Sequence, residues 1–279
     1  MAGFRTNIGS VEVTALSDGR LLFKPQDFFP KLDASAWEPY RDQLTEDGRL
    51  EMNMGCYVLR SEGKNVLVDT GLGPFGYDFE DVITGQLMAS MKERGIAPAE
   101  IDFVVITHLH RDHVGWNFSP EGGEMRPTFP NARYMIPKND WDVFTRRTSM
   151  SAFRYIAEQV EPLRDMGLLE LTEGETQVTS ELSTLPTPGH TAGHTSLLIS
   201  SQGEKGMVVG DASHVPLQAQ EPDWSPRPDV DPEQSASSRR MLMDMMEREN
   251  GLLIGGHYPA PGFGRLVRLQ GRRYWRGLD

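Results

Sequence analysis

Histidine and aspartate gather in one short segment of this sequence, the run His-Leu-His-Arg-Asp-His at residues 108–113. The run follows an apolar segment, residues 103–106, that has the composition of a buried strand. His190, Asp211 and His257 likewise follow apolar or turn-forming segments. Because strand ends hold side chains rigidly, they can deliver imidazole and carboxylate groups to one point with the accuracy that a metal ion requires. The pattern predicts a metal centre.

The spacing within residues 108–113 predicts ligands for two ions rather than one. In an extended backbone His108 and His110 project to the same side, so one ion can take both imidazoles. The chain must then turn, which lets Asp112 and His113 point toward a second ion a short distance away.

The three remaining residues complete the two ligand groups. We expect His190 to join the first ion and His257 to join the second. Asp211 is the natural bridge, because a carboxylate has two oxygens and offsets the charge of two cations. This set of imidazoles and carboxylates suits zinc, iron, manganese or cobalt and disfavours calcium and magnesium. The predicted ligands are His108, His110, Asp112, His113, His190, Asp211 and His257.

The elements that position these ligands alternate along the chain. Buried strands are predicted at residues 103–106, 133–136, 195–200, 206–209 and 252–254, and helices at residues 81–94, 137–145, 151–166 and 232–249. Near the N-terminus, Ser-Asp-Gly at residues 17–19 predicts a hairpin turn between short strands, and residues 56–60 and 65–69 form a second hairpin. Early strands followed by mixed strands and helices predict a layered α/β sandwich.

One domain over residues 1–279 is favoured, because the chain shows no repeat or linker. Residues 24–50 have no strand or helix period and carry Phe28, Phe29, Trp37 and Tyr40. We interpret this segment as an excursion from the core that forms either an apolar lid or contacts with a second subunit. Core packing is the alternative for each aromatic residue taken singly.

The composition excludes several classes of partner. With 28 Lys and Arg against 40 Asp and Glu, the net charge of −12 disfavours nucleic acid. The single cysteine, Cys56, excludes an intrachain disulfide. No apolar run approaches the ~20 residues that a membrane span needs, and the first residues lack the order of a secretory signal. We therefore expect a cytoplasmic protein without a membrane partner.

These motifs resemble those of the metallo-β-lactamase-fold hydrolase superfamily. The markers are Val-Asp-Thr-Gly at residues 68–71, the run at 108–113, Pro-Gly-His-Thr at 188–191, Gly-Asp at 210–211 and Gly-His at 256–257. The resemblance implies a four-layer αβ/βα sandwich with a two-metal site at the edge between two sheets. It also implies that Asp69 lies beside the metal site and orients the ligands.

Within the superfamily, the sequence is most similar to quorum-quenching acyl-homoserine lactonases and to methyl-parathion-hydrolase-like enzymes, which share all the predicted ligands. Aspartate at position 211 argues against true β-lactamases, which carry Cys or Ser there. The lactonases usually carry a tyrosine three residues after the bridging aspartate, where this chain has His214. That histidine, together with residues 112–117 and 256–262, resembles the parathion-hydrolase branch more.

The resemblance implies an enzyme that uses two divalent ions, first of all Zn²⁺, to cleave small apolar lactones or esters with a metal-bridging hydroxide. Activity toward phosphotriesters is the expected side reaction. The alternatives are an organophosphate hydrolase, a mono-iron persulfide dioxygenase and a β-lactamase-like enzyme. The expected partners are a small-molecule substrate and a second copy of the chain, as a homodimer.

Further residues have candidate roles around the metal ions. His214 is a candidate proton donor to the substrate or leaving group, and the equal alternative is a histidine held by the backbone. Asp112 is a candidate proton acceptor in addition to a ligand, and His194 is expected to support the site structurally. The candidates for the wall of the substrate pocket are Phe28, Phe29 and Trp116.

Overall fold

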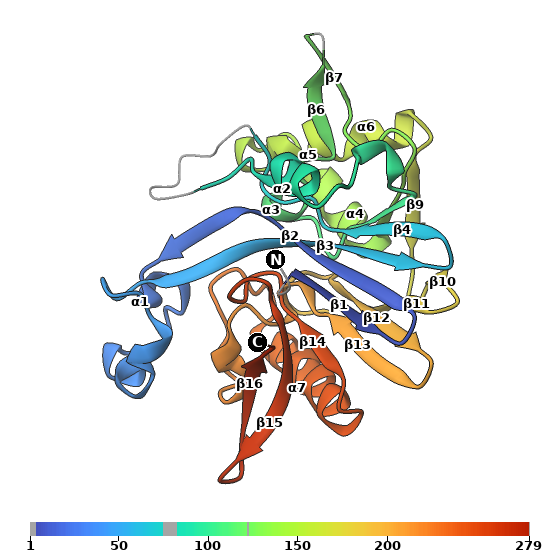
Figure 1. Cartoon of the computed structure of the whole chain (residues 1–279). Coiled ribbons are helices and arrows are strands. Elements are labelled where there is room, and N and C mark those ends of the chain that lie inside the picture. The colour runs from blue at the N-terminus through green and yellow to red at the C-terminus, as the bar shows by residue number, and fades with distance from the viewer. Residues whose placement is uncertain (1–3, 75–82, 122, 279) are drawn as a thin grey trace.

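Two seven-stranded β-sheets form the centre of the molecule in the computed structural model, which describes residues 4–74, 83–121 and 123–278 (Figure 1). The first sheet has the order β1-β2-β3-β4-β5-β8-β9, and the second runs from β10 to β16 in sequence order. The strands of the first sheet are β1 (Arg5–Ile8), β2 (Val11–Phe23), β3 (Leu50–Ser61), β4 (Lys64–Val68), β5 (Phe103–Val105), β8 (Arg133–Pro137) and β9 (Leu169–Thr172). The strands of the second are β10 (Gln177–Thr179), β11 (Leu182–Pro186), β12 (Thr195–Ser201), β13 (Glu204–Val208), β14 (Leu252–Ile254), β15 (Phe263–Leu269) and β16 (Arg272–Gly277).

Parallel pairing occurs where the predicted ligands follow the strands. In the first sheet, β4, β5, β8 and β9 are parallel neighbours, and in the second sheet β13 pairs in parallel with β14. Parallel neighbours end at the same edge of a sheet, so the loops that follow them lie close together. A separate two-stranded sheet, β6 (Phe118–Glu121) and β7 (Glu124–Pro127), projects from the body (Figure 1).

Helices cover the outer face of each sheet. One apolar cluster joins the inner faces of the two sheets, with Val13 and Val66 meeting Leu197 and Ile254. A second cluster packs the first sheet against its helices, and a third packs the second sheet against the longest helix. The helices are α1 (Pro25–Phe28), α2 (Leu87–Glu93), α3 (Arg111–Val114), α4 (Lys138–Phe144), α5 (Arg154–Gln159), α6 (Glu161–Asp165) and α7 (Pro232–Arg248). The layer order is therefore αβ/βα, as the family resemblance implied.

The hairpin predicted around residues 17–19 is wrong. β2 continues through this segment with a bulge between Ser17 and Arg20. The Asp18 carboxylate is fully buried and accepts backbone N–H bonds from Leu72, Gly73 and Leu87 at 2.9–3.0 Å. Aspartate before glycine is a common turn signal, but here the carboxylate accepts from a distant loop and from the first residue of α2, and β2 continues.

Other sequence predictions differ in their boundaries. The second hairpin is confirmed as β3–β4, and the helix predicted at 232–249 is confirmed as α7. The helix predicted at 81–94 is shorter, since α2 begins only at Leu87, and residues 81–82 lie outside the described residues. Segment 151–166 divides into α5 and α6, with Pro162 in the first turn of α6.

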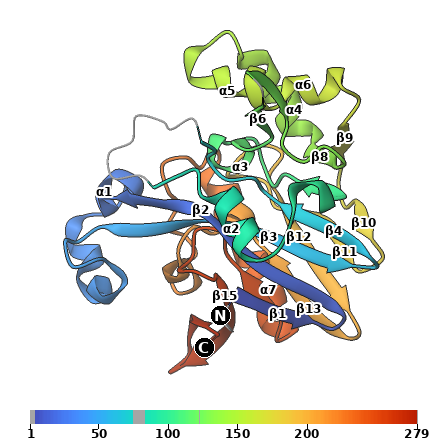
Figure 2. The ribbon, with the colours of Figure 1, turned by 45° about the horizontal axis from the view of Figure 1, so that its top comes forward.

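The excursion at residues 24–50 lies where β2 ends and β3 begins, at one side of the molecule in Figures 1 and 2. It consists of α1, a 3-10 helix over Ala34–Gln43 and connecting turns. Trp37 is 3% exposed and packs with Phe29 and Trp224 at ring-centroid distances of 5.6 and 5.1 Å. These aromatic side chains therefore form a small core within the chain itself. A role as a lid or in subunit contacts stays a prediction.

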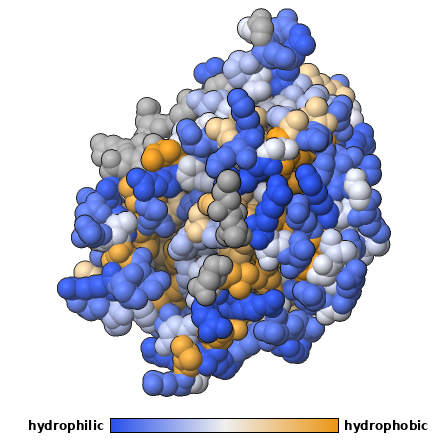
Figure 3. Space-filling model, viewed as in Figure 1, coloured by the Kyte–Doolittle hydropathy of each residue, from blue (hydrophilic) through white to orange (hydrophobic). Residues whose placement is uncertain are grey.

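Polar side chains cover most of the face in Figure 3, with apolar side chains gathered in patches between them. Within the described ranges, no helix combines the length and apolar character that crossing a membrane requires.

Candidate active site

All the predicted ligands meet at one edge of the two sheets. His108 and His110 lie in the loop after β5, and Asp112 and His113 follow on α3. His190 lies between β11 and β12, Asp211 on a 3-10 helix (Gly210–Ala212) after β13, and His257 after β14. Residues far apart in sequence thus converge because each one follows a strand of the paired sheets.

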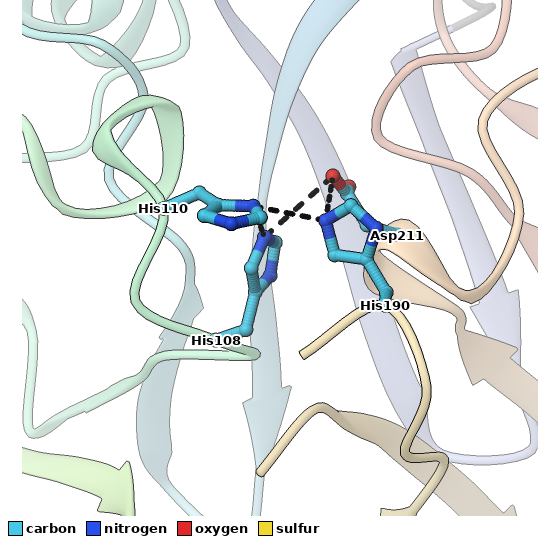
Figure 4. A group of neighbouring side chains, drawn as sticks. All are labelled: His108, His110, His190 and Asp211. Atoms are coloured by element: carbon cyan, nitrogen blue, oxygen red, sulfur yellow. Dashed lines mark hydrogen bonds and ion pairs between the residues drawn. The ribbon is translucent and has the colours of Figure 1, made fainter. Parts of the chain in front are cut away.

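The first group is His108, His110, His190 and Asp211, drawn in Figure 4. His110 Nδ1 lies 3.0 Å from His108 Nε2 and 2.9 Å from His190 Nε2. Asp211 Oδ2 lies 3.2 Å from His190 Nε2 and 3.6 Å from His108 Nε2. Three ring nitrogens and one carboxylate oxygen therefore face one point, as three histidine ligands and a carboxylate ligand would.

The second group is Asp112, His113 and His257. Asp112 Oδ2 lies 3.7 Å from His113 Nε2 and 3.6 Å from His257 Nε2. The other oxygen of Asp211, Oδ1, lies 3.3 Å from His113 Nε2 and 3.2 Å from His257 Nε2. The two oxygens of Asp211 thus face different groups, with Oδ2 toward the first and Oδ1 toward the second.

The outer ring nitrogens show which nitrogens are free for a metal. His113 Nδ1 is 2.8 Å from Asp69 Oδ2, His190 Nδ1 is 2.9 Å from Asp229 Oδ1, and His257 Nδ1 is 2.8 Å from the Asn53 carbonyl. A carbonyl or carboxylate oxygen only accepts, so these Nδ1 atoms donate. In the neutral ring each Nε2 then carries a lone pair that can bind a metal. This is the arrangement that metal-binding histidines usually adopt.

Buried polar atoms at the centre lack hydrogen bonds. His113 Nε2 and Asp211 Oδ1 are buried, yet neither makes a hydrogen bond to any residue that the structure describes. Buried polar atoms are rarely left in this state. A divalent cation between the two would satisfy both, so these residues fit the metal ions that the sequence predicts.

The electrostatics of the centre also favour cations. Burial alone would lower the pKa of His190, but Asp211 and Asp229 raise it to about 9. Burial and the neighbouring His190 lower the pKa of His110 to about 3. The pKa of Asp211 is held well below its usual range, against the effect of burial, by His257 and His113. The carboxylate therefore keeps its charge and must be balanced by a proton on a neighbouring ring or by a metal ion.

Asp69 supports the second ligand group through its hydrogen bond with His113. Its Oδ1 accepts the Thr107 backbone N–H at 2.8 Å, and its Oδ2 accepts the Thr107 hydroxyl at 2.8 Å as well as His113 Nδ1–H. The residue has a positive φ of 58°, which aspartate tolerates better than most residues. The geometry thus places Asp69 where it can orient His113 and the end of β5.

His194 holds the segment that carries Asp211. Its Nε2 accepts the Asp211 backbone N–H at 2.9 Å, so its Nδ1 carries the proton and lies 2.8 Å from Thr187 Oγ1. Burial and the neighbouring His190 lower the pKa of His194 to about 3, so the ring stays neutral. Both ring nitrogens are occupied by the protein, which agrees with a structural rather than a ligand role.

Two carboxylates support the site from positions that the sequence analysis did not identify. Asp140, on α4, accepts bonds from the Leu109 N–H at 3.0 Å, the Thr191 hydroxyl at 2.8 Å and the Gly193 N–H at 2.6 Å. It thereby joins the loop of His108 and His110 to the loop of His190. Asp229 holds His190 directly. Neither lies in a recognisable motif, and each has charged residues close by in the sequence, so no local signal distinguishes it.

His214 lies beside Asp211, at the centre of the site. Its Nε2 is 3.2 Å from Asp211 Oδ2, and its ring stacks on His257 with a centroid distance of 5.7 Å. Its Nδ1 is buried without a hydrogen-bond partner among the described residues. Burial lowers the pKa of His214 although Asp211 opposes the shift. The lowered pKa favours the neutral ring, which has one donor and one acceptor nitrogen.

A cavity of about 370 Å³ opens directly onto both ligand groups. Its wall includes His110, Asp112, His190, Asp211, His214 and His257 together with the apolar side chains of Leu21, Phe23, Phe28, Met52, Leu72 and Phe153. Arg111, Tyr155 and Arg227 add polar groups.

Of the three residues predicted to line a substrate pocket, only Phe28 lies in the wall of this cavity. Phe29 is fully buried behind it, at a ring-centroid distance of 5.1 Å. Trp116 points the other way, because its indole N–H donates to Asp18 at 2.7 Å and its ring belongs to the cluster between sheet and helices. The prediction for Phe29 and Trp116 therefore differs from their positions in the structure.

A molecule in this cavity would lie beside nitrogen and oxygen atoms that are oriented for divalent cations. This arrangement is that of a metal-dependent hydrolase. The chain belongs to the metallo-beta-lactamase superfamily, whose family model matches residues 56–257 and so includes every predicted ligand. The family and the fold predicted from the sequence are both confirmed.

Among relatives in sequence, the N-acyl homoserine lactonase AiiA of Bacillus thuringiensis subsp. kurstaki is 26% identical over 230 residues, which cover 77% of this chain and 84% of the relative. Among solved structures, AidC, a dizinc quorum-quenching lactonase, is similar with a TM-score of 0.83 at 22% identity, covering 99% of this chain and 97% of its own. The hydrolase AbOPH has a TM-score of 0.85 at 21% identity, with the same coverage. At these identities the structural matches show the fold.

Replacing Asp69 by asparagine is expected to weaken metal binding by about 10–100-fold, the usual effect of removing a partner of a metal-binding histidine. An amide has one acceptor oxygen, so it cannot accept from His113, Thr107 N–H and the Thr107 hydroxyl together. Competition with a chromophoric chelator would measure the affinity. Asp33→Asn is the matched control, since Asp33 is exposed and its side chain makes no capping bond. Equal affinities in the two variants would contradict the role of Asp69.

Proposed function

We propose that this protein is a dinuclear metallo-hydrolase that opens small apolar lactones or cleaves small esters, with phosphotriesters as secondary substrates. His108, His110 and His190 would hold one divalent ion, and Asp112, His113 and His257 the other, with Asp211 contributing one oxygen to each. We propose Zn²⁺ as the metal, since imidazole and carboxylate ligands suit it. When bound, such ions would polarise a substrate carbonyl and lower the pKa of a coordinated water.

The observation that carries this proposal is the position of the Asp211 carboxylate. Its two oxygens lie 3.2 Å from His190 Nε2 and 3.2 Å from His257 Nε2, on opposite sides, and the carboxylate lines the cavity. A carboxylate shared in this way suits a pair of ions better than a single ion. This distinguishes the proposal from a mono-iron oxygenase, which would use only the first group.

The wall of the cavity supports a small, largely apolar substrate. Phe28, Met52 and Phe153 offer apolar surface beside the ligands, and the volume of about 370 Å³ lies within the range of small-molecule sites. The sequence relatives that are named N-acyl homoserine lactonases support a lactone as the first substrate to test.

Two residues beside the ligands would act on the substrate. His214 would take up the proton that the attacking water releases and would donate it to the oxygen that leaves when the ester bond breaks. Asp112 would accept a proton from the attacking water in addition to its role as a ligand. The apolar wall around Phe28 would exclude bulk water from the scissile bond.

The test is a pH-indicator assay of metal-loaded protein on short- and long-chain homoserine lactones, simple γ- and δ-lactones, an aryl ester and a phosphotriester, each with and without a chelator. Lactone turnover that exceeds phosphotriester turnover and disappears with chelator is the expected result. Phosphotriester or aryl-ester cleavage without lactone turnover would replace the proposal with an organophosphate hydrolase. A lack of turnover on every substrate would overturn the proposed function. Metal analysis of the purified protein gives the identity and number of the ions.

We propose homodimerisation from the resemblance and from the aromatic residues of segment 24–50, and a cytoplasmic location stays an expectation from the sequence. Light scattering on the purified protein measures the first, and cell fractionation measures the second.

A further inference from the structure

Arg239 is a fully buried arginine at the inner face of α7, outside the set of residues that touch a metal or substrate in the proposed function. Arginine is almost never fully buried unless its charge and donors are satisfied. Here burial lowers the pKa of Arg239, opposed by Asp229. The residue therefore needs an explanation that helix packing alone does not provide.

Every N–H group of Arg239 has an acceptor. Nε donates to the Ala212 carbonyl at 2.7 Å, and one terminal nitrogen donates to the carbonyls of Pro222 and Trp224 at 2.6 and 3.1 Å. The other donates to the Ser235 hydroxyl at 2.9 Å and to Asp229 Oδ2 at 3.4 Å. A guanidinium has five N–H donors in one plane, so this set uses all of them.

Two of these acceptors are directly connected to predicted metal ligands, one through the backbone and one through a hydrogen bond. Ala212 follows Asp211 directly, so the bond to its carbonyl holds the segment of the shared carboxylate. Asp229 accepts from Arg239 through Oδ2 and from His190 Nδ1 through Oδ1. One rigid group on α7 therefore contacts the supports of both His190 and Asp211.

The backbone around Asp229 strengthens the connection. The Val230 N–H donates to the His190 carbonyl at 3.2 Å, and the Asp231 N–H donates to the Gly189 carbonyl at 2.8 Å. The segment that Arg239 holds is thus bonded to both the backbone and the side chain of His190. A shift of Asp229 would move the ring and its loop together.

We propose that Arg239 is a positioning residue of the metal centre, which sets the placement of His190 relative to Asp211 and thereby the affinity of the first ligand group for its ion. This inference rests on the proposed function for the presence of the ions. Lysine cannot substitute, because an ammonium has three donors and no planar fork. The same guanidinium holds residues 222 and 224, which lead to Arg227 and Pro228 in the cavity wall.

The test compares Arg239→Lys with Arg240→Lys. Arg240 is the next residue of α7 but is 46% exposed and pairs with Asp223 at the surface, so it controls for the loss of an arginine on this helix. Zn²⁺ affinity is measured on the folded full-length protein by chelator competition, and the Co²⁺-loaded forms are compared by their visible absorption spectra. Chemical denaturation of the metal-free variants gives their stability separately.

For Arg239→Lys we expect the affinity for one of the two ions to fall by about 10–100-fold, as for other groups that orient a ligand. The cobalt spectrum should change and kcat should fall by more than KM rises. Arg240→Lys should match the wild type in all three. A variant whose metal-free form is less stable, but which binds both ions with wild-type affinity and an unchanged spectrum, would overturn the proposal.

Asp229→Asn provides a second route if Arg239→Lys does not fold. The amide keeps the size of the side chain and can still accept from His190, but it removes the charge that pairs with Arg239. The same loss of affinity and change of spectrum are expected. Because metal binding is measured without substrate, a failure on lactones would overturn the proposed function while leaving this result intact. Wild-type affinity in both variants would overturn the inference alone.

Discussion

Replacing Asp211 by asparagine is expected to lower the affinity for both ions and to reduce hydrolysis by two to four orders of magnitude. The amide keeps the shape of the side chain but removes the charge that faces His190 and His257. Its NH₂ group would also point a donor at one ligand group. Loss of one member of a buried charged pair costs about 3–5 kcal/mol, which corresponds to this range. Metal content after dialysis and turnover under saturating metal would measure the effect.

Asp231→Asn is a suitable control for this prediction. Asp231 is an exposed aspartate whose carboxylate caps α7 by accepting the Gln234 N–H, and asparagine caps a helix equally well. It should keep both ions and full activity. Two tightly bound ions in Asp211→Asn would show that the carboxylate does not join the two groups and would contradict its shared role.

Replacing His214 by phenylalanine is expected to lower kcat by about 10²–10⁴-fold, the contribution that a positioned proton donor makes. Phenylalanine keeps a flat ring against Phe28, which lies 5.4 Å away, but it removes both ring nitrogens. Metal content should remain at the wild-type level, since His214 belongs to neither ligand group. Turnover and metal analysis of the same sample would separate the two roles that the sequence left open.

His214→Tyr is the informative companion. By the resemblance given in the sequence analysis, tyrosine is the lactonase residue at this position, and a phenol can donate a hydrogen bond to a substrate oxygen. We expect it to recover lactone turnover relative to His214→Phe, while phosphotriester turnover recovers less. Phe28→Leu alters the same wall without removing a donor, so it should change KM more than kcat. If His214→Phe retained wild-type kcat, His214 would be a packing residue.

The class of fold and the predicted ligand set both came from local signals in the sequence. The spacing within residues 108–113 depends on local backbone geometry, which repeats every two residues in an extended chain. His190, Asp211 and His257 were identifiable because each follows an apolar or turn-forming segment. Such signals are local, so they can be interpreted without knowledge of the fold.

The groups that orient the predicted ligands became visible only in the folded structure. Asp140 and Arg239 lie on helices far along the chain from the residues they contact. The sequence predicts a turn at Asp18, but its carboxylate accepts from the N–H groups of Leu72 and Leu87, more than fifty residues away. The same carboxylate accepts the indole N–H of Trp116 and so turns this side chain away from the cavity. The partner of a buried charge is whatever the fold brings to it, and no local pattern encodes that choice.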